Sequence, residues 1–472
     1  MNAPAAPVLW RAREAAAATG GTTRGDWRAT GVSIDSRTVA AGDLFIALPG
    51  DRFDGHDYVG AALEKGAAAA MIARDLAGLP VDAPLLRVAD SMAGLNALAA
   101  AARRRSRAKV CAITGSVGKT GTKEALALVL RAQGPTTATV GNLNNHIGVP
   151  LSLARLDAAQ AFAVFELGMN HPGEIAPLSE LVRPDAAIIT TVEAVHLEFF
   201  DSETAIADEK ATIMDGLAHT GAAILNRDNA HFERLAAYAR RRGIARIVGF
   251  GSHPEATYRL IACTVDDTGS SVEALAAGRA LSFRIGAPGR HWVMNALAVL
   301  AAVDAVGGDV AHAARDLANL APPKGRGARR ALRLARGTVT LIDDSYNASP
   351  PSMRAALGVL GAAHPGAGGR RIAVLGDMLE LGPRGPALHA DLAPALVDAG
   401  IDLVFTAGPL MRHLHDALPA ARRGAHADTA AALIEPLIAA LGDGDVVLVK
   451  GSHGSRIASV VSALAALEQG GS

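Results

Sequence analysis

The sequence feature that most constrains the fold is a glycine loop that follows a strand-like run and opens a helix. The run Lys109-Val-Cys-Ala-Ile-Thr114 leads into Gly115-Ser-Val-Gly-Lys-Thr120. In such loops glycines let backbone N–H groups approach phosphates, a lysine reaches the outer phosphates, and a hydroxyl ligates Mg²⁺. The full motif has a further glycine where this chain has Ile113. The pattern therefore predicts a short phosphate-binding loop, and the alternative is an ordinary glycine turn.

Composition narrows the class of protein. The chain has 472 residues, 50% of them hydrophobic, and a formal net charge of +0, so no global charge favours nucleic acid or a membrane surface. Its two cysteines lie far apart in the sequence, which favours reduced thiols in a cytosolic protein. We find no export leader pattern and no apolar run long enough for a membrane span. The expected location is the cytoplasm.

Strand-like and helix-like runs alternate almost throughout, which predicts an α/β fold with parallel sheets covered by helices. A helix that ends in Arg103-Arg-Arg105 precedes the first junction, and a stretch rich in Pro, Gly and Arg at 321–327 marks the second. We predict three domains: a small N-terminal α/β domain (1–106), a central P-loop ATPase-type domain with a parallel sheet (107–321), and a C-terminal Rossmann-like, doubly wound domain (322–472).

Polar residues follow two strand-like runs of the central segment. Glu166 closes Phe162-Ala-Val-Phe165, and His196 follows an apolar run that ends at Val195. Ligands of open parallel sheets bind beyond the carboxyl ends of the strands, and a carboxylate there suits Mg²⁺. Glu166 is therefore a candidate metal ligand, with an exposed strand end as the alternative. A single histidine after a strand is more often structural, so the residues alone support His196 as a ligand only weakly.

Two further segments contain candidate site residues. Lys210 lies on a helix where Ile206 and Ile213 share its face, so it leans towards the buried side, although most helix lysines are solvated. The loop 142–148 is rich in amide side chains that can donate to phosphate or carboxylate oxygens. Turn formation is the alternative there, and we favour a ligand loop that includes Asn142, Asn144 and Asn145. In the last segment Asp344, Asn347, Ser349 and Lys450 also follow strand-like runs.

Several motifs in this order resemble the Mur ligase family across nearly the whole chain. Besides the glycine loop they include Gly141-Asn-Leu-Asn-Asn-His-Ile-Gly148, Glu166-Leu-Gly-Met-Asn-His-Pro-Gly-Glu-Ile175, Asp343-Asp-Ser-Tyr-Asn-Ala-Ser-Pro350, Gly376-Asp-Met-Leu-Glu-Leu-Gly382 and Lys450-Gly-Ser452. In the first segment Ser33-Ile-Asp-Ser-Arg37 and Asp51-Arg-Phe-Asp-Gly-His56 resemble the family's uridine-nucleotide segment.

The resemblance implies a role for each candidate residue. Lys119, Glu166, His196 and Lys210 would be catalytic, and Thr120, Glu166, His196 and a carbamylated Lys210 would hold Mg²⁺. ATP would be bound by Gly115, Ser116, Val117, Gly118, Lys119, Thr120, His291, Asn295 and Arg326. The UDP-linked substrate would be bound by Ser33, Asp35, Ser36, Arg37, Asn142, Asn144 and Asn145, and an incoming D-alanyl-D-alanine by Asp344, Asn347 and Ser349. The chain departs from the family pattern at Trp292, Ser349 and His453, where asparagine, asparagine and arginine are common.

The implied activity is ATP-dependent amide-bond formation between UDP-N-acetylmuramoyl-tripeptide and D-alanyl-D-alanine, by a monomer that uses ATP and Mg²⁺. Members that add diaminopimelate or lysine would show an Asp-Asn-Pro-Arg-type motif, which this chain lacks. Folylpolyglutamate synthetases lack the uridine-type segment. A nucleotide-dependent switch without catalysis is the alternative from another class.

Overall fold

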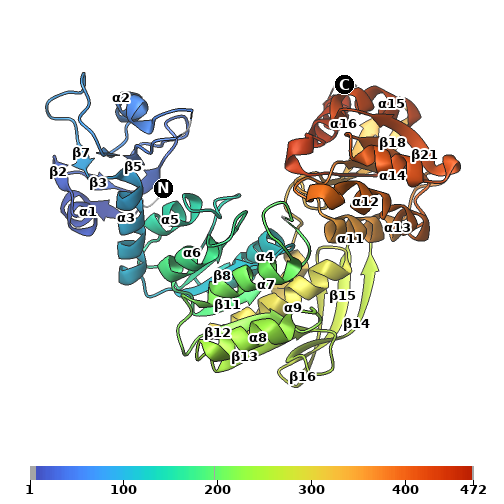
Figure 1. Ribbon diagram of the computed structural model, residues 1–472, viewed down its shortest axis with the longest axis horizontal. Helices are drawn as coiled ribbons and strands as arrows, with labels where there is room; N and C mark the ends of the chain where they lie inside the picture. The colour runs from blue at the N-terminus through green and yellow to red at the C-terminus, as the bar shows by residue number, and fades with distance from the viewer. Residues whose placement is uncertain (1–6, 51, 196, 470–472) are drawn as a thin grey trace, which may run out of the picture.

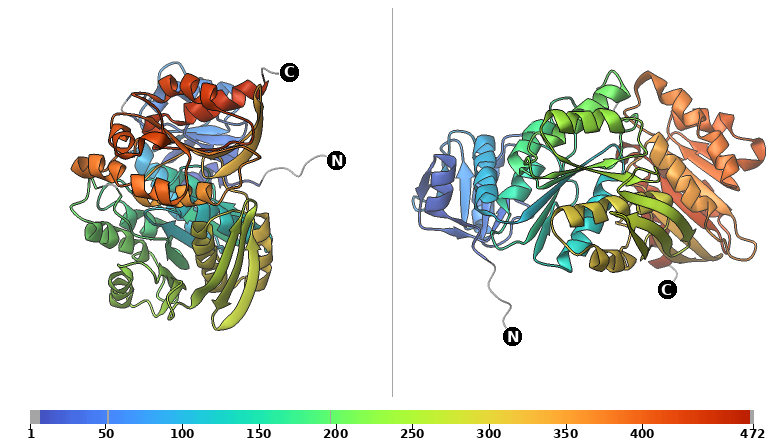
Figure 2. Two further views of the ribbon diagram at one scale, coloured as in Figure 1. Left: turned by 90° about the vertical axis from the view of Figure 1, so that its right-hand side faces the viewer. Right: turned by 90° about the horizontal axis from the view of Figure 1, so that it is seen from below.

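The computed structural model describes residues 7–50, 52–195 and 197–469. They form three sheet-containing parts that follow one another along the long axis of the molecule, with the N-terminal part at one end and the C-terminal part at the other (Figure 1). The view from below in Figure 2 gives the same order. The three-part α/β prediction is confirmed.

The N-terminal part is a five-stranded sheet with the order β2-β7-β6-β5-β4. Strands β4 to β7 run parallel, and β2 is antiparallel to β7. The elements are β1 (Trp10–Arg11), α1 (Ala12–Thr19), β2 (Thr22–Arg24), β3 (Arg28–Ala29), β4 (Gly31–Ser33), β5 (Asp43–Ile46), α2 (Val59–Glu64), β6 (Ala69–Ile72), β7 (Leu85–Arg87) and α3 (Ser91–Arg105). The carboxylate of Asp90 caps α3 by accepting from the Ala93 N–H over 2.6 Å.

The central part is a nine-stranded sheet with the order β16-β15-β14-β13-β12-β11-β8-β10-β9. Its strands are β8 (Lys109–Thr114), β9 (Thr136–Ala138), β10 (Phe162–Glu166), β11 (Ala186–Ile189), β12 (Ala222–Asn226), β13 (Arg246–Gly251), β14 (Tyr258–Asp266), β15 (Gly269–Ala276) and β16 (Arg279–Ile285). Its helices are α4 (Lys119–Arg131), α5 (Gly148–Ala154), α6 (Ile175–Val182), α7 (Glu203–Ala211), α8 (Phe232–Arg241), α9 (Arg290–Ala305) and α10 (Val310–Asp316).

The prediction of a parallel central sheet is correct for strands β8 to β14 and wrong for the rest. Strands β15 and β16 add antiparallel hairpins. β16 and the second half of β14 are largely exposed, and β15 alternates buried with exposed positions, so the hairpin strands do not show the continuous apolar runs of buried parallel strands.

The C-terminal part is a six-stranded sheet with the order β17-β18-β22-β19-β20-β21, parallel except for β17. Its strands are β17 (Ala328–Leu334), β18 (Gly337–Asp344), β19 (Arg371–Gly376), β20 (Leu403–Ala407), β21 (Arg423–Ala427) and β22 (Val446–Lys450). Its helices are α11 (Pro350–Gly361), α12 (Gly385–Ala390), α13 (Ala393–Asp398), α14 (Met411–Ala417), α15 (Ala430–Ala440) and α16 (Ala458–Gln469).

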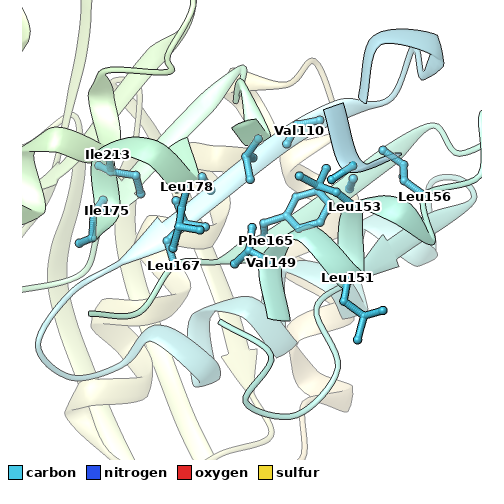
Figure 3. Packing of buried hydrophobic residues seen from close by; sticks show 14 of the residues in the cluster. Val110, Val149, Leu151, Leu153, Leu156, Phe165, Leu167, Ile175, Leu178 and Ile213 are labelled. Atoms are coloured by element: carbon cyan, nitrogen blue, oxygen red, sulfur yellow. The ribbon is translucent and has the colours of Figure 1, made fainter. Parts of the chain in front are cut away.

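The N-terminal and central parts share one hydrophobic core. A single cluster runs from Leu9 through α3 to the face of the central sheet covered by α5 and α6. Figure 3 shows part of it, where Phe165 of β10 lies near Leu153 and Val149 of α5. Polar contacts reinforce the junction, because the indole N–H of Trp10 donates to the Ala154 carbonyl over 2.9 Å and Arg103 Nε donates to the Val182 carbonyl over 2.7 Å.

The C-terminal part has its own cores on the two faces of its sheet. Polar contacts that join it to the central part include Arg329 Nη1 and His364 Nδ1, each 3.0 Å from the Asp267 carboxylate. The separate cores support the predicted boundary near 321. At the boundary near 106 the two sheets are separate, but the hydrophobic core runs across it. Both boundaries stay predictions.

Cys111 is buried in β8 and Cys263 is half-buried in β14, and both thiols are free. Within the described ranges, no helix has the length and apolar character needed to cross a membrane.

Candidate active site

A cleft of about 1000 Å³ lies between the central and C-terminal parts. It is lined by the glycine loop 116–121 from the central part and by residues that follow β18 and β22 of the C-terminal part. The parallel strands place these segments at one edge of each sheet, as expected for open α/β sheets.

The glycine loop joins β8 to α4, as the sequence predicts. Gly115 and Gly118 have φ of 148° and 88°, in the region that favours glycine, and a Cβ on Gly115 would collide with the Thr190 hydroxyl. Lys119 Nζ donates to the Gly115 carbonyl over 2.7 Å. Burial lowers the pKa of Lys119, an effect that the Glu166 charge opposes. The loop therefore presents backbone N–H groups and one ammonium group to the cleft.

Glu166 lies at the end of β10 with only 1% of its surface exposed. Its Oε1 accepts from the Asn144 side-chain amide over 2.9 Å. Its Oε2 is buried and has no hydrogen-bond partner within the described part of the chain. A buried carboxylate oxygen without a partner is costly unless a cation or donor completes it, so this donor set fits a divalent cation such as Mg²⁺.

Lys210 lies near the end of α7 and is 1% exposed, so its predicted buried orientation is found. Burial, followed by the charge of Lys119, holds the pKa of Lys210 well below its usual range. Its neighbour Glu209 accepts hydrogen bonds from the N–H groups of Gly173 and Ile175 over 2.8 and 2.9 Å. These bonds fix the start of α6 and the loop before it to α7. The other predicted ligand on this side, His196, lies outside the described residues.

Helix α9 packs directly beside the glycine loop and also borders the cleft. His291, Trp292 and Asn295 all line the cleft. His291 is exposed at the cleft, where desolvation by the surrounding protein, followed by the charge of Lys450, lowers its pKa to about 4. The ring is therefore neutral near pH 7.

The C-terminal part supplies a second charged wall. Lys450 Nζ lies 2.8 Å from Asp344 Oδ2 and donates to the Asn347 carbonyl over 2.9 Å. The guanidinium of Arg326 stacks over the ring of Tyr346 at 4.2 Å. Ser349 caps α11 through a capping box with Ser352. Of the residues predicted for the dipeptide, Asp344 and Asn347 thus both contact Lys450, whose side chain is 3% exposed.

The cleft contains most but not all of the predicted site. The predicted residues that line it are Ser116, Val117, Gly118, Lys119, Thr120, Asn142, Asn144, Asn145, Glu166, His291, Asn295, Arg326, Asp344, Asn347 and Ser349. Ser33, Asp35, Ser36 and Arg37 do not line it, because they lie in the N-terminal part, at the end of β4 and in the loop that follows it. There Arg37 donates to Asp35 from its side chain and its backbone, and these bonds lower the pKa of Asp35 to about 2.

Other residues that line the cleft were not predicted as site residues. They include Asn170, His171, Glu174, Asn226, Trp292 and Tyr346. Glu174 Oε2 accepts from the N–H groups of Asn170 and His171, and the His171 ring contacts Phe199 edge-on at 4.5 Å. The available signal was the run Met169-Asn-His-Pro-Gly-Glu174, which begins three residues after Glu166 and so also follows the end of β10.

Comparisons with known proteins agree with this architecture. Three family models match: the Mur ligase family, catalytic domain over residues 28–103, the Mur ligase middle domain over 113–303, and the Mur ligase, glutamate ligase domain over 329–453. The UDP-N-acetylmuramoyl-tripeptide--D-alanyl-D-alanine ligase of Escherichia coli is 38% identical over 435 residues, which is 92% of this chain and 93% of that one.

Solved structures give the same result. MurF from Acinetobacter baumannii has a TM-score of 0.85 and 29% identity, covering 97% of this chain and 99% of the other. MurF ligase from Thermotoga maritima, solved in complex with ADP, has a TM-score of 0.76 and 26% identity, covering 94% of this chain and 98% of the other. With these matches along nearly its whole length, the chain belongs to the Mur ligase family.

Proposed function

We propose that this chain uses ATP to join the tripeptide carboxylate of UDP-N-acetylmuramoyl-tripeptide to the amine of D-alanyl-D-alanine. The observation that carries the proposal is one cleft that brings the glycine loop and Glu166 together with the Asp344–Lys450 wall. Relatives named for this ligation match more than nine-tenths of the chain, and one MurF structure was solved in complex with ADP. The activity would serve the cytoplasmic stage of peptidoglycan synthesis.

The first step is transfer of a phosphoryl group. A carboxylate oxygen of the tripeptide attacks the γ-phosphorus, the bond to ADP breaks, and an acyl phosphate forms. Such a transfer depends on positioning and on charge neutralisation, which the loop N–H groups and Lys119 supply at the phosphates. Arg326 reaches the same cleft from the C-terminal part.

The second step forms the amide bond. The dipeptide amine attacks the acyl carbon, the bond to phosphate breaks, and the amine proton is released together with phosphate. Asp344, Asn347 and Ser349 would hold the dipeptide beside the reacting carbon. Loss of one preorganised donor to a developing oxyanion typically costs about 3 kcal/mol.

Mg²⁺ would be held by Glu166, the Thr120 hydroxyl, His196 and Lys210, if the Lys210 amine is carbamylated. The buried Oε2 of Glu166 supports this set, and the lowered pKa of Lys210 supplies the neutral amine that carbamylation requires. When bound, Mg²⁺ supplies positive charge at the phosphate oxygens. Ser33, Asp35, Ser36 and Arg37 would hold the uridine nucleotide, and Asn142, Asn144 and Asn145 the part of that substrate near the glycine loop.

The test is phosphate release by the purified chain with ATP, Mg²⁺ and UDP-N-acetylmuramoyl-tripeptide. Acceptors to compare are D-alanyl-D-alanine, D-alanine, L-lysine, diaminopimelate and L-glutamate. Release that requires the dipeptide supports the proposal, whereas turnover with another acceptor keeps the family and overturns the substrate. Nucleotide binding without turnover on any acceptor would favour a non-catalytic switch. The mass in solution with substrates bound tests the proposed monomer.

A further inference from the structure

Trp292 occupies a position unlike those of the other two tryptophans in the chain. Trp10 and Trp27 are buried in the core shared by the N-terminal and central parts. Trp292 is 4% exposed, lies in the first turn of α9 and borders the cleft. A large buried aromatic side chain beside a phosphate-binding loop contributes packing where small displacements matter for catalysis.

The indole is seated on a glycine of the helix that the loop opens. A Cβ added to Gly121 would lie 2.9 Å from Trp292 Cζ3 and 3.0 Å from Cη2. Gly121 directly follows Lys119 and Thr120 in α4. Glycine within a helix is less stable than alanine by about 0.5–1 kcal/mol, so this position gives up helix stability for the close approach of the indole.

The next turn of α9 makes a parallel contact. A Cβ on Gly118 would lie 2.8 Å from Asn295 Oδ1. Trp292 and Asn295 are three residues apart and therefore share one face of α9. Gly118 of the loop and Gly121 of α4 thus leave room for two side chains of α9.

We propose that Trp292 is a positioning residue for the nucleotide site: its indole, seated on Gly121, holds the first turn of α4, with Lys119 and Thr120, against α9. The inference rests on the proposed ATP site. A shorter side chain would free the turn to move, and a larger residue at 121 would push the two helices apart. Either change would weaken nucleotide binding and leave the sites for the other substrates intact.

The test is a double-mutant cycle on steady-state kinetics of the full chain. Trp292→Phe and Gly121→Ala should each raise KM for ATP roughly tenfold, within the range of up to about 10²-fold seen for ~1 Å misplacements. KM for UDP-N-acetylmuramoyl-tripeptide should change less than about twofold, since other elements bind that substrate. In the double variant the smaller ring leaves room for the new methyl group, so KM for ATP should return towards the native value.

Trp27→Phe is the matched control, because Trp27 is 6% exposed in the distant core. It should leave KM for ATP unchanged even if stability falls. Quenching of tryptophan fluorescence by ATP should persist in Trp27→Phe and disappear in Trp292→Phe. An unchanged KM for ATP in both single variants, or strictly additive effects in the double variant, would overturn the inference. Failure of the native chain to bind ATP would instead remove the proposed function.

Discussion

The side-chain amide of Asn144 donates a hydrogen bond of 2.9 Å to Oε1 of Glu166. The bond orients a carboxylate whose other oxygen is buried without a partner among the described residues. The loop that contains Asn144 is thereby joined to the end of β10, so the amide residues and the proposed metal ligand form one unit.

Replacing Asn144 by Asp should place a second carboxyl group against Glu166. Two carboxylates at this distance cannot both ionise easily, so the pKa of one should rise. We expect the acid limb of the kcat/KM profile for ATP to move to higher pH, with activity near pH 7 reduced about 10–100-fold. Asn144→Ala removes the bond without adding charge, so it should lower activity without moving the limb. Identical profiles for the two variants would contradict the expectation.

Lys119→Met should abolish most phosphoryl transfer, because it removes the ammonium group that faces the cleft from the glycine loop. A loss of about 10²–10³-fold in kcat is expected from the removal of one stabilising charge. Lys109→Met is the matched control, since Lys109 begins β8, the strand that leads into the glycine loop, at the end far from the loop, and its side chain is 57% exposed. The measurement is the rate of phosphate release by the two variants. Equal rates would exclude the proposed role of Lys119.

The Asp344–Lys450 pair should be coupled in stability. Asp344→Asn leaves the Lys450 ammonium, which is 3% exposed, without its charged partner, and should cost about 3 kcal/mol of unfolding free energy. Lys450→Met should cost less, because burial raises the pKa of Asp344 and the carboxyl group can take up a proton. Urea unfolding of the single variants and of Asp344→Asn/Lys450→Met should show that the double variant recovers part of the loss. Additive losses would argue that the pair does not interact.

Stability should fall in mild acid because of His389. This fully buried ring accepts from the Met378 N–H at Nε2 over 2.9 Å and contacts the Gly385 carbonyl at Nδ1 over 2.7 Å, so both nitrogens suit the neutral form. Burial lowers the pKa of His389 from its ordinary 6.5. The neutral His389 ring therefore makes its full contribution to the free energy of unfolding above pH 6.5. This contribution is lost as pH falls below 6.5, by at most about 1.4 kcal/mol per pH unit.

Unfolding free energies measured between pH 5 and 7.5 should show a flatter slope in His389→Gln, after allowing for its lower stability. His219→Gln, at an exposed position of the central part, is the control and should keep the native slope. If the unfolding free energy of His389→Gln fell with pH as steeply as that of the native chain, groups other than His389 would take up the proton.

The sequence predicted the parts of the fold that produce continuous apolar runs. Strands such as β8, β10 and β22 are buried on both faces, so their sequences stand out, and each ends in a polar residue that the structure places at or near the cleft. The antiparallel strands β15 and β16 were missed because their partly exposed residues give a weak pattern.

The site was harder to predict where function depends on contacts between distant segments. Nothing in the sequence near Gly121 indicates that an indole 171 positions later rests on it. The motif after Glu166 was noticed, but Asn170 and His171 were not assigned, because their access to the cleft depends on backbone N–H groups of this loop that donate to the carboxylates of Glu209 and Glu174. Ser33 to Arg37 stay a prediction, since the described cleft does not reach them.

The shared core of the N-terminal and central parts should keep these two parts together as one body, with the C-terminal part as another. Separating those parts would expose the apolar cluster that runs through α3, whereas polar bonds such as those to Asp267 can be exchanged for water. On the proposed assignment, the uridine nucleotide and ATP therefore sit on a single body, and the dipeptide arrives on another. The phosphoryl group would then be transferred within one body at a preset separation, while the amide bond would form only when the second body swings in with its amine.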